Sequence, residues 1–276
     1  MLYLRTIPGL LTGRANIMNL RPVLKTVIAC LACVAVAAPG LTADRYHDAR
    51  MTMVKEIEDD VRRTSLYLDR ESLDPRVMDA MATVPRHRLI PDDMRESAYD
   101  NRPLPIGHGQ TIYQTYIVAL MSDLLQTQED HVVLEVGTGS GYQTAVLSRL
   151  VRHVYSIELV SELGQASAGR LKELGYTNVE CRIGNGYSGW PEHAPYNGII
   201  VTAAATHIPQ PLVDQLVTGG RLVIPVGDPY GPQELVVVTR GEDDHIHMRE
   251  ILGVAFVPLQ EETGDTERKM DEKSGG

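Results

Sequence analysis

The chain has 276 residues, enough for one sizeable buried core but few for two full domains. Apolar residues make up 43% of the chain and charged residues 22%, which is typical of a globular domain. The formal net charge of −10 argues against a surface that follows nucleic-acid phosphates, because such binding depends on Lys and Arg. We therefore expect no nucleic-acid partner.

Residues 1–43 have the layout of a secretory signal, with basic residues at positions 14, 21 and 25 before an apolar run. The run, Thr26 to Ala38, has 13 residues, which suits a signal core and falls short of the ~20 that span a bilayer. We expect a periplasmic or secreted protein without a stable membrane anchor. Met18 is an alternative start. An upstream extension followed by a buried helix, in a cytoplasmic protein, is the alternative for the whole segment.

Cleavage of this leader would remove four basic residues and no acidic ones, which changes the net charge from −10 to −14. Cys30 and Cys33 lie within the leader, and Cys30 loosely resembles a lipoprotein cleavage site, a minor alternative. After cleavage Cys181 would have no intramolecular partner, so we expect no disulfide.

Helices and loops are expected before the middle of the chain. Apolar spacing predicts a surface helix within 44–70, and Asp74-Pro75 predicts the cap and first turn of a second helix that ends at Pro85. Prolines and glycines make residues 86–113 a structured loop region, and a helix should follow Thr115.

Strands and helices then alternate, which predicts a parallel sheet flanked by helices within one α/β domain, residues 44–260. The sheet should be closed at its edge by an antiparallel pair, and a polar tail, residues 261–276, should be disordered. The expected strands are 131–136, 154–158, 179–183, 198–202, 221–226, 235–239 and 251–257, and the expected helices between them are 142–150, 161–174 and one opened by Pro209 and Pro211.

A glycine loop follows the first of these strands, where open α/β sheets bind ligands. The loop reads Gly137-Thr138-Gly139-Ser140-Gly141, and glycine is needed there for close approach of a ligand and for positive φ. A dinucleotide fingerprint would have its third glycine at position 142, which is Tyr. The spacing favours an adenosyl ligand without a pyrophosphate.

Two acidic residues support the same site. Glu158 ends the second strand about 20 residues after the loop, where a carboxylate accepts hydrogen bonds from ribose hydroxyls. Glu135, near the end of the first strand, is expected to hold the turn or to contact the ligand through water.

Several segments in the right order make the chain resemble the protein-L-isoaspartate O-methyltransferase family, from about Asp74 to Pro258. The main segments are Glu135 to Ala145, Gly184 to Pro191, Ile200 to Ala204, Gly109-Gln110-Thr111-Ile112 and Arg221 to Gly227. The resemblance implies a Rossmann-like class I methyltransferase fold with S-adenosylmethionine as cofactor. It also implies methyl esterification of the α-carboxyl of L-isoaspartyl residues in damaged proteins.

The resemblance implies that Asn185 and Gly186 lie beside the adenine and that Thr111 and Gln114 orient the substrate carboxylate. No acid-base pair is required, since the acceptor is already ionised and alignment supplies the rate. His87, His108, His193 and His207 are scattered and are expected to be loop or surface residues; no metal site is expected. A monomer is the default expectation.

Three positions depart from the family pattern. The family's active-site serine is replaced by Tyr113, with Thr115 in place of a following proline, so the catalytic residue is left unassigned. Asn185 replaces an Asp, which predicts weaker cofactor affinity. Asn197 replaces an Asp where the fourth strand begins, and a structural role is as plausible there as a functional one.

These departures leave two alternatives to isoaspartyl methylation. The chain could be a degenerate member that binds altered peptides without turnover, or it could methylate another acceptor. An exported enzyme would also need a supply of cofactor outside the cytosol, where it is made.

Overall fold

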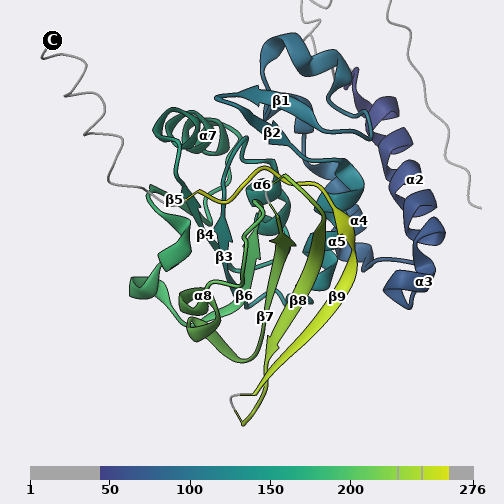
Figure 1. The fold of residues 1–276 in the computed structure, drawn as a ribbon. Helices are drawn as coiled ribbons and strands as arrows, with labels where there is room; N and C mark the ends of the chain where they lie inside the picture. Colours follow the sequence, from purple (N-terminus) through teal and green to yellow (C-terminus); the bar gives the residue numbers. More distant parts are fainter. Residues whose placement is uncertain (1–43, 229, 244, 261–276) are drawn as a thin grey trace, which may run out of the picture. The chain divides into compact units, whose positions relative to one another are not determined.

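The computed structural model describes residues 44–228, 230–243 and 245–260 (Figure 1). The expected leader, 1–43, and the expected polar tail, 261–276, lie outside the described residues, so both remain predictions. Within the described ranges, no helix combines the length and apolarity needed to cross a membrane.

A seven-stranded sheet in the order β5-β4-β3-β6-β7-β8-β9 forms the centre of the domain (Figure 1). The first five strands in this order are parallel, and β8 and β9 are each antiparallel to the strand before them. This arrangement confirms the mostly parallel sheet with an antiparallel C-terminal pair. The strands are β3 (Val132–Val136), β4 (His153–Glu158), β5 (Val179–Ile183), β6 (Tyr196–Val201), β7 (Leu216–Gly227), β8 (Gln233–Arg240) and β9 (Ile246–Val254).

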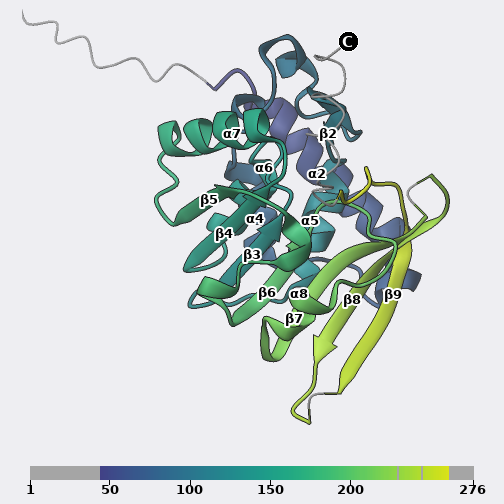
Figure 2. The same ribbon diagram turned by 60° about the vertical axis from the view of Figure 1, so that its left-hand side comes forward.

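Helices cover both faces of this sheet, and the side-chain alternation of the strands explains why. Val133 and Leu134 point to opposite faces, and each joins a different hydrophobic cluster. In Figure 2, α8 lies in front of the sheet, and α4 and α5 lie behind it. The helices are α2 (His47–Arg63), α3 (Ser65–Leu68), α4 (Pro75–Thr83), α5 (Thr115–Leu124), α6 (Tyr142–Ser148), α7 (Ser161–Glu173) and α8 (Gln210–Asp214).

The predicted start of α4 is confirmed in detail. The Asp74 side chain accepts a hydrogen bond of 2.8 Å from the backbone N–H of Arg76, and Pro75 occupies the first turn. Helix α2 also agrees with the apolar spacing, since Met53, Ile57 and Val61 are among its buried residues.

The loop region before α5 contains a short antiparallel hairpin, β1 (Leu104–Gly107) and β2 (Gln110–Ile112). Residues 107–109 turn the chain with positive φ angles of 91°, 53° and 72°. Both strands are too short to give a recognisable pattern, so the sequence predicted only a loop.

The last strand differs most from expectation, because β9 begins at Ile246 and the prediction placed its start at 251. Residues 246–250 are exposed, so the strand pairs with β8 through its backbone without the apolar alternation that reveals a strand.

Candidate active site

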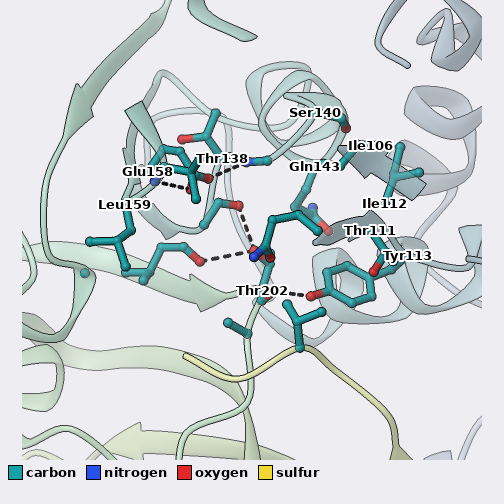
Figure 3. Close-up of a pocket in the computed structure, with 18 of the residues that line it drawn as sticks. Ile106, Thr111, Ile112, Tyr113, Thr138, Ser140, Gln143, Glu158, Leu159 and Thr202 are labelled. Atoms are coloured by element: carbon teal, nitrogen blue, oxygen red, sulfur yellow. Dashed lines mark hydrogen bonds between the residues drawn. The ribbon is translucent and has the colours of Figure 1, made fainter. Parts of the chain in front are cut away.

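A cavity lies at the carboxyl ends of the central strands, beside the loop that joins β3 to α6 (Figure 3). From β3 the chain continues to β4 on one side, and β6 pairs with the other side of β3, so the loop lies where the order of the strands reverses. Ligands bind at such a switch point in open α/β sheets.

The three glycines of this loop have the positive φ angles expected of them, 99° at Gly137, 51° at Gly139 and 86° at Gly141. A Cβ on Gly137 would lie 2.4 Å from Thr202 Oγ1, so another residue there would displace the Thr202 side chain, which follows β6. A Cβ on Gly139 would point toward Ile106 Cδ1, at 3.5 Å, and Ile106 also lines the cavity. Any side chain at position 139 would therefore fill space in which a ligand can bind.

Glu158 is joined directly to the glycine loop. Its Oε2 accepts a hydrogen bond of 2.7 Å from Gly139 N–H, and its Oε1 accepts one of 2.9 Å from Val160 N–H. The side chain lines the cavity, and the residue is only 7% exposed. A carboxylate has about four lone-pair sites, so each oxygen can still accept from a ligand hydroxyl.

Glu135 lies beneath the loop, and it is absent from the residues that line the cavity. It is fully buried, and its Oε2 accepts hydrogen bonds from Thr144 and from Ser156, which is itself 2.6 Å from Thr138 Oγ1. Burial raises the pKa of the Glu135 carboxyl to about 8, although the hydrogen bonds from Ser156 and Thr144 oppose the rise. Of its two expected roles, these contacts favour holding the turn.

Seven predicted site residues line the cavity and four do not. Gln114 instead lines a separate hollow together with residues of α2 and β9. The predicted residues that line the active-site cavity are Thr111, Gly137, Thr138, Gly139, Ser140, Glu158 and Gly186. Those that do not line it are Gln114, Glu135, Gly141 and Asn185.

Asn185 does not line the cavity, but its side chain bonds to the backbone of the turn that contributes Gly186 to it. Its Oδ1 accepts a hydrogen bond of 2.9 Å from Tyr187 N–H and so caps the short turn that begins at Gly186. A Cβ on Gly186 would lie 2.2 Å from Val136 Cγ1, so this turn packs directly on β3. Asn197 has a structural role as well, since its Oδ1 accepts from Val132 N–H at 2.8 Å at the start of β3.

Tyr113 lies in the wall of the cavity, and its hydroxyl is already engaged. The hydroxyl donates a hydrogen bond of 2.5 Å to the carbonyl oxygen of Thr202 (Figure 3). The ring packs on Phe256, with centroids 4.0 Å apart. Burial raises the pKa of this phenol above its usual value, so the hydroxyl is protonated at neutral pH. The extra bulk relative to serine is thus accommodated against Phe256.

Two parts of the cavity were not predicted. The sequence indicated Thr202 only as part of a family segment, and it indicated no role in the site for residues 257–260. The carboxy-terminal segment reaches the cavity by pairing with Ala204, whose N–H donates to Val257 O at 2.8 Å and whose carbonyl accepts from Leu259 N–H at 2.8 Å. Such nonlocal pairing leaves no signal in the sequence of either segment.

The residues that line the cavity are suited to holding ligands in position. None of the histidines in the described ranges lines the cavity, and the described part of the chain holds no group of three or more His, Cys, Asp or Glu placed to bind a metal. The cavity instead combines the glycine loop, one buried carboxylate and apolar walls. Those walls include Ile106, Ile112, Val136, Ile157 and Leu159.

Comparison with known proteins agrees with this geometry. Residues 64–264 match the family model described as protein-L-isoaspartate(D-aspartate) O-methyltransferase (PCMT). The chain is 57% identical over 233 residues to protein-L-isoaspartate O-methyltransferase 2 of Syntrophobacter fumaroxidans, covering 84% of this chain and 94% of the relative. It is 49% identical over 239 residues to protein-L-isoaspartate O-methyltransferase 1 of Cupriavidus necator, covering 87% and 92%.

A solved structure shares the fold. A Plasmodium falciparum protein described as a putative PCMT, in complex with S-adenosyl-L-homocysteine, superposes with a TM-score of 0.61 at 26% identity, covering 75% of this chain and 97% of that one. The family model covers more than half of the chain, and the curated relatives are matched over almost their whole length. The chain therefore belongs to the protein-L-isoaspartate(D-aspartate) O-methyltransferase family.

Proposed function

We propose that this protein transfers a methyl group from S-adenosylmethionine to the α-carboxyl of L-isoaspartyl residues, as a protein-repair enzyme. The observation that carries the proposal is the contact between Glu158 and Gly139 at the switch point of the sheet, in a chain 57% identical to a protein-L-isoaspartate O-methyltransferase.

The residues of the cavity fit this cofactor. Gly137 and Gly139 leave space beside the cavity that a side chain would fill, and Glu158 offers acceptor capacity for ribose hydroxyls. Gly186 closes the same cavity from the turn after β5. When bound, S-adenosylmethionine supplies a methyl group on a positively charged sulfur.

The protein's own task is to align the acceptor and exclude water. An α-carboxyl titrates near pH 3.5, so it is ionised at neutral pH and no residue has to remove a proton from it. Thr111 lines the cavity and can donate a hydrogen bond to the carboxylate. Tyr113 and the segment 257–260 form the wall beside it, and Phe256 packs against the Tyr113 ring. Alignment of this kind is sufficient to account for large rate increases.

The test is transfer of labelled methyl groups to a peptide that contains L-isoaspartate, with the matching aspartyl peptide as control. We expect transfer to the isoaspartyl peptide and little to the aspartyl peptide. Absence of transfer to either peptide at saturating donor would rule the proposal out.

A degenerate binding protein, or an enzyme for another acceptor, is the second candidate, and the Tyr113 hydroxyl is the observation that favours it. That hydroxyl is bonded to Thr202 O, so it is not free to donate to an acceptor as a serine would be. Wild type should be assayed beside Tyr113→Ser and Tyr113→Ser/Thr115→Pro. Thr115 is the first residue of α5, where proline is tolerated. Turnover that appears only in the variants would identify a degenerate member.

Export is a separate proposal that rests on the leader. We propose that residues 1–43 direct the chain out of the cytosol, leaving a methyltransferase domain of residues 44–260 and a polar tail, 261–276. Sequencing of the amino terminus after fractionation of cells tests this directly. A cytosolic protein that retains residues 1–43 would contradict it.

A further inference from the structure

A second cavity, of about 180 Å³, lies away from the active site, between the end of α5 and strands β7 to β9. Arg221 of β7 is paired with Gly198 of β6, which is paired with Val133 of β3. The cavity is therefore level with the beginning of β3, whereas the glycine loop follows the end of that strand. The two cavities have no lining residue in common.

Positive side chains line this cavity, and none of the described residues that line it is acidic. Arg70 comes from the segment after α3, Arg221 from β7, and His247 and Arg249 from β9. Four cationic or titratable side chains thus converge from three parts of a chain whose overall charge is −10. Gln126 and Thr239 add neutral hydrogen-bond donors to the same walls.

The charges of these arginines are only partly balanced. Arg70 forms an ion pair with Asp123, whose other oxygen accepts from Asp74 N–H at 2.7 Å. Arg221 donates to a neutral group, the carbonyl oxygen of Leu124, at 3.2 Å. The Arg249 side chain makes neither a hydrogen bond nor an ion pair with any residue in the described ranges. Among the described residues, only one of these three guanidinium groups, that of Arg70, is therefore paired with a carboxylate.

The imbalance also affects the proton affinity of Arg221. Burial lowers the pKa of its guanidinium, and repulsion from Arg249 and Arg70 lowers it further. Arginines that were only solvated surface groups would gain by spreading apart, because like charges repel. Their convergence on one cavity is instead the arrangement that binds oxyanions, since the planar guanidinium donates two parallel hydrogen bonds to a phosphate or carboxylate.

We propose that the cavity lined by Arg70, Arg221 and Arg249 is a binding site for a compact dianion, of which inorganic phosphate or the phosphate group of a small ester is the best match. A water molecule occupies about 30 Å³ in the liquid, so the volume admits a phosphate with some of its hydration. This proposal does not depend on methyl transfer, and measurements of anion binding alone test it.

The test is calorimetric titration of the full chain with inorganic phosphate, at an ionic strength held constant with sodium chloride. We expect one site, and a rise in melting temperature of about 4 °C at ten times the dissociation constant. Absence of binding to wild type, or an equal response to chloride, would overturn the proposal.

Variants locate the site. Arg249→Gln, on an exposed strand, should bind phosphate at least about tenfold more weakly, and Arg221→Gln/Arg249→Gln should lose binding. Arg152→Gln/Lys172→Gln makes the same change in charge at exposed positions elsewhere and should bind like wild type. Undiminished binding by folded Arg221→Gln/Arg249→Gln would contradict the assignment. A parallel titration with glycerol 3-phosphate decides the source: binding of both ligands defines a phosphomonoester site, and binding of phosphate alone defines a site for the free ion.

Discussion

At the scale of single residues, two side chains that line the cavity also bond to neighbouring segments of the chain. Glu158 is the clearest of them, because the same carboxylate holds the glycine loop through Gly139 and faces the cavity. Tyr113 is the most unusual, because its hydroxyl and ring are both committed to neighbouring parts of the wall. We expect a change of the Glu158 carboxylate to weaken cofactor binding, and removal of the Tyr113 hydroxyl to leave methyl transfer intact.

Glu158→Gln should weaken binding of S-adenosylmethionine by roughly 10- to 100-fold, since hydrogen bonds to a charged group contribute about 1.5–3 kcal/mol. The amide oxygen can keep the bond from Gly139 N–H, but the bond from Val160 N–H is lost, so the free energy of unfolding should also fall by about 1 kcal/mol. Calorimetric titration with the cofactor measures the effect. Glu162→Gln, at an exposed position on α7, is the matched control and should bind like wild type. Equal affinities for wild type and Glu158→Gln would exclude the ribose role.

Tyr113→Phe removes only the hydroxyl that donates to Thr202 O and keeps the ring against Phe256. We expect the free energy of unfolding to fall by about 1 kcal/mol, the net value of one hydrogen bond, while methyl transfer is retained. Urea denaturation and the transfer assay measure the two effects. A large loss of turnover at unchanged stability would show that the hydroxyl contacts the reacting groups.

At the scale of elements, polar side chains join the strands and helices that carry the site. Glu135 links β3 to α6 through Thr144 and to β4 through Ser156, directly below the glycine loop. Asp74 begins α4, and its backbone N–H donates to Asp123 of α5, so it also joins two helices. Each contact makes a stability prediction that does not depend on activity.

The free energy of unfolding should decrease between about pH 5 and pH 8 through Glu135. Its pKa is about 8 in the folded chain and 4.5 as an isolated side chain, so in this range only the folded state keeps the proton. Because the folded state then binds more protons than the unfolded state, stability is lost as pH rises toward 8 and the loss levels off above it. Urea denaturation of wild type and Glu135→Gln across this range isolates the effect. Glu173→Gln, at an exposed position on α7, should follow wild type. A constant difference between wild type and Glu135→Gln would contradict the assignment.

Asp74→Ala should lower the free energy of unfolding by about 1 kcal/mol, because it removes the side-chain cap of α4. The backbone bond from residue 74 to Asp123 remains in the variant. Asp79→Ala removes an exposed acidic side chain from the same helix and is the control. The cap would have no energetic role if both variants had the stability of wild type.

At the scale of the whole molecule, the sequence predicted the parts whose signal is local. Most of the parallel strands agree within two residues, because buried strands such as 132–136 are continuous apolar runs. The exception is β7, which begins at Leu216 where the prediction placed its start at 221, because the residues before 221 include two glycines and exposed positions. The glycine loop and Glu158 were predicted because their spacing along the chain reflects the βαβ unit itself. Gln114 lines a hollow apart from the cavity, so its role in orienting the substrate stays a prediction. The start of β9 was missed because its first residues are exposed.

The wall of the active site joins segments that are distant in sequence, which yields the last prediction. Residues 257–260 line the cavity and pair with Ala204, more than fifty positions earlier. A chain that ends at Phe256 should lose methyl transfer and melt at a lower temperature, because Ala204 loses both backbone partners and the cavity loses one wall. A chain that ends at Gln260 keeps this segment and should be as active as the full chain. Equal activity of the two truncated chains would show that the segment does not contribute to the site, and Tyr113, supported by Phe256, would then suffice to exclude water.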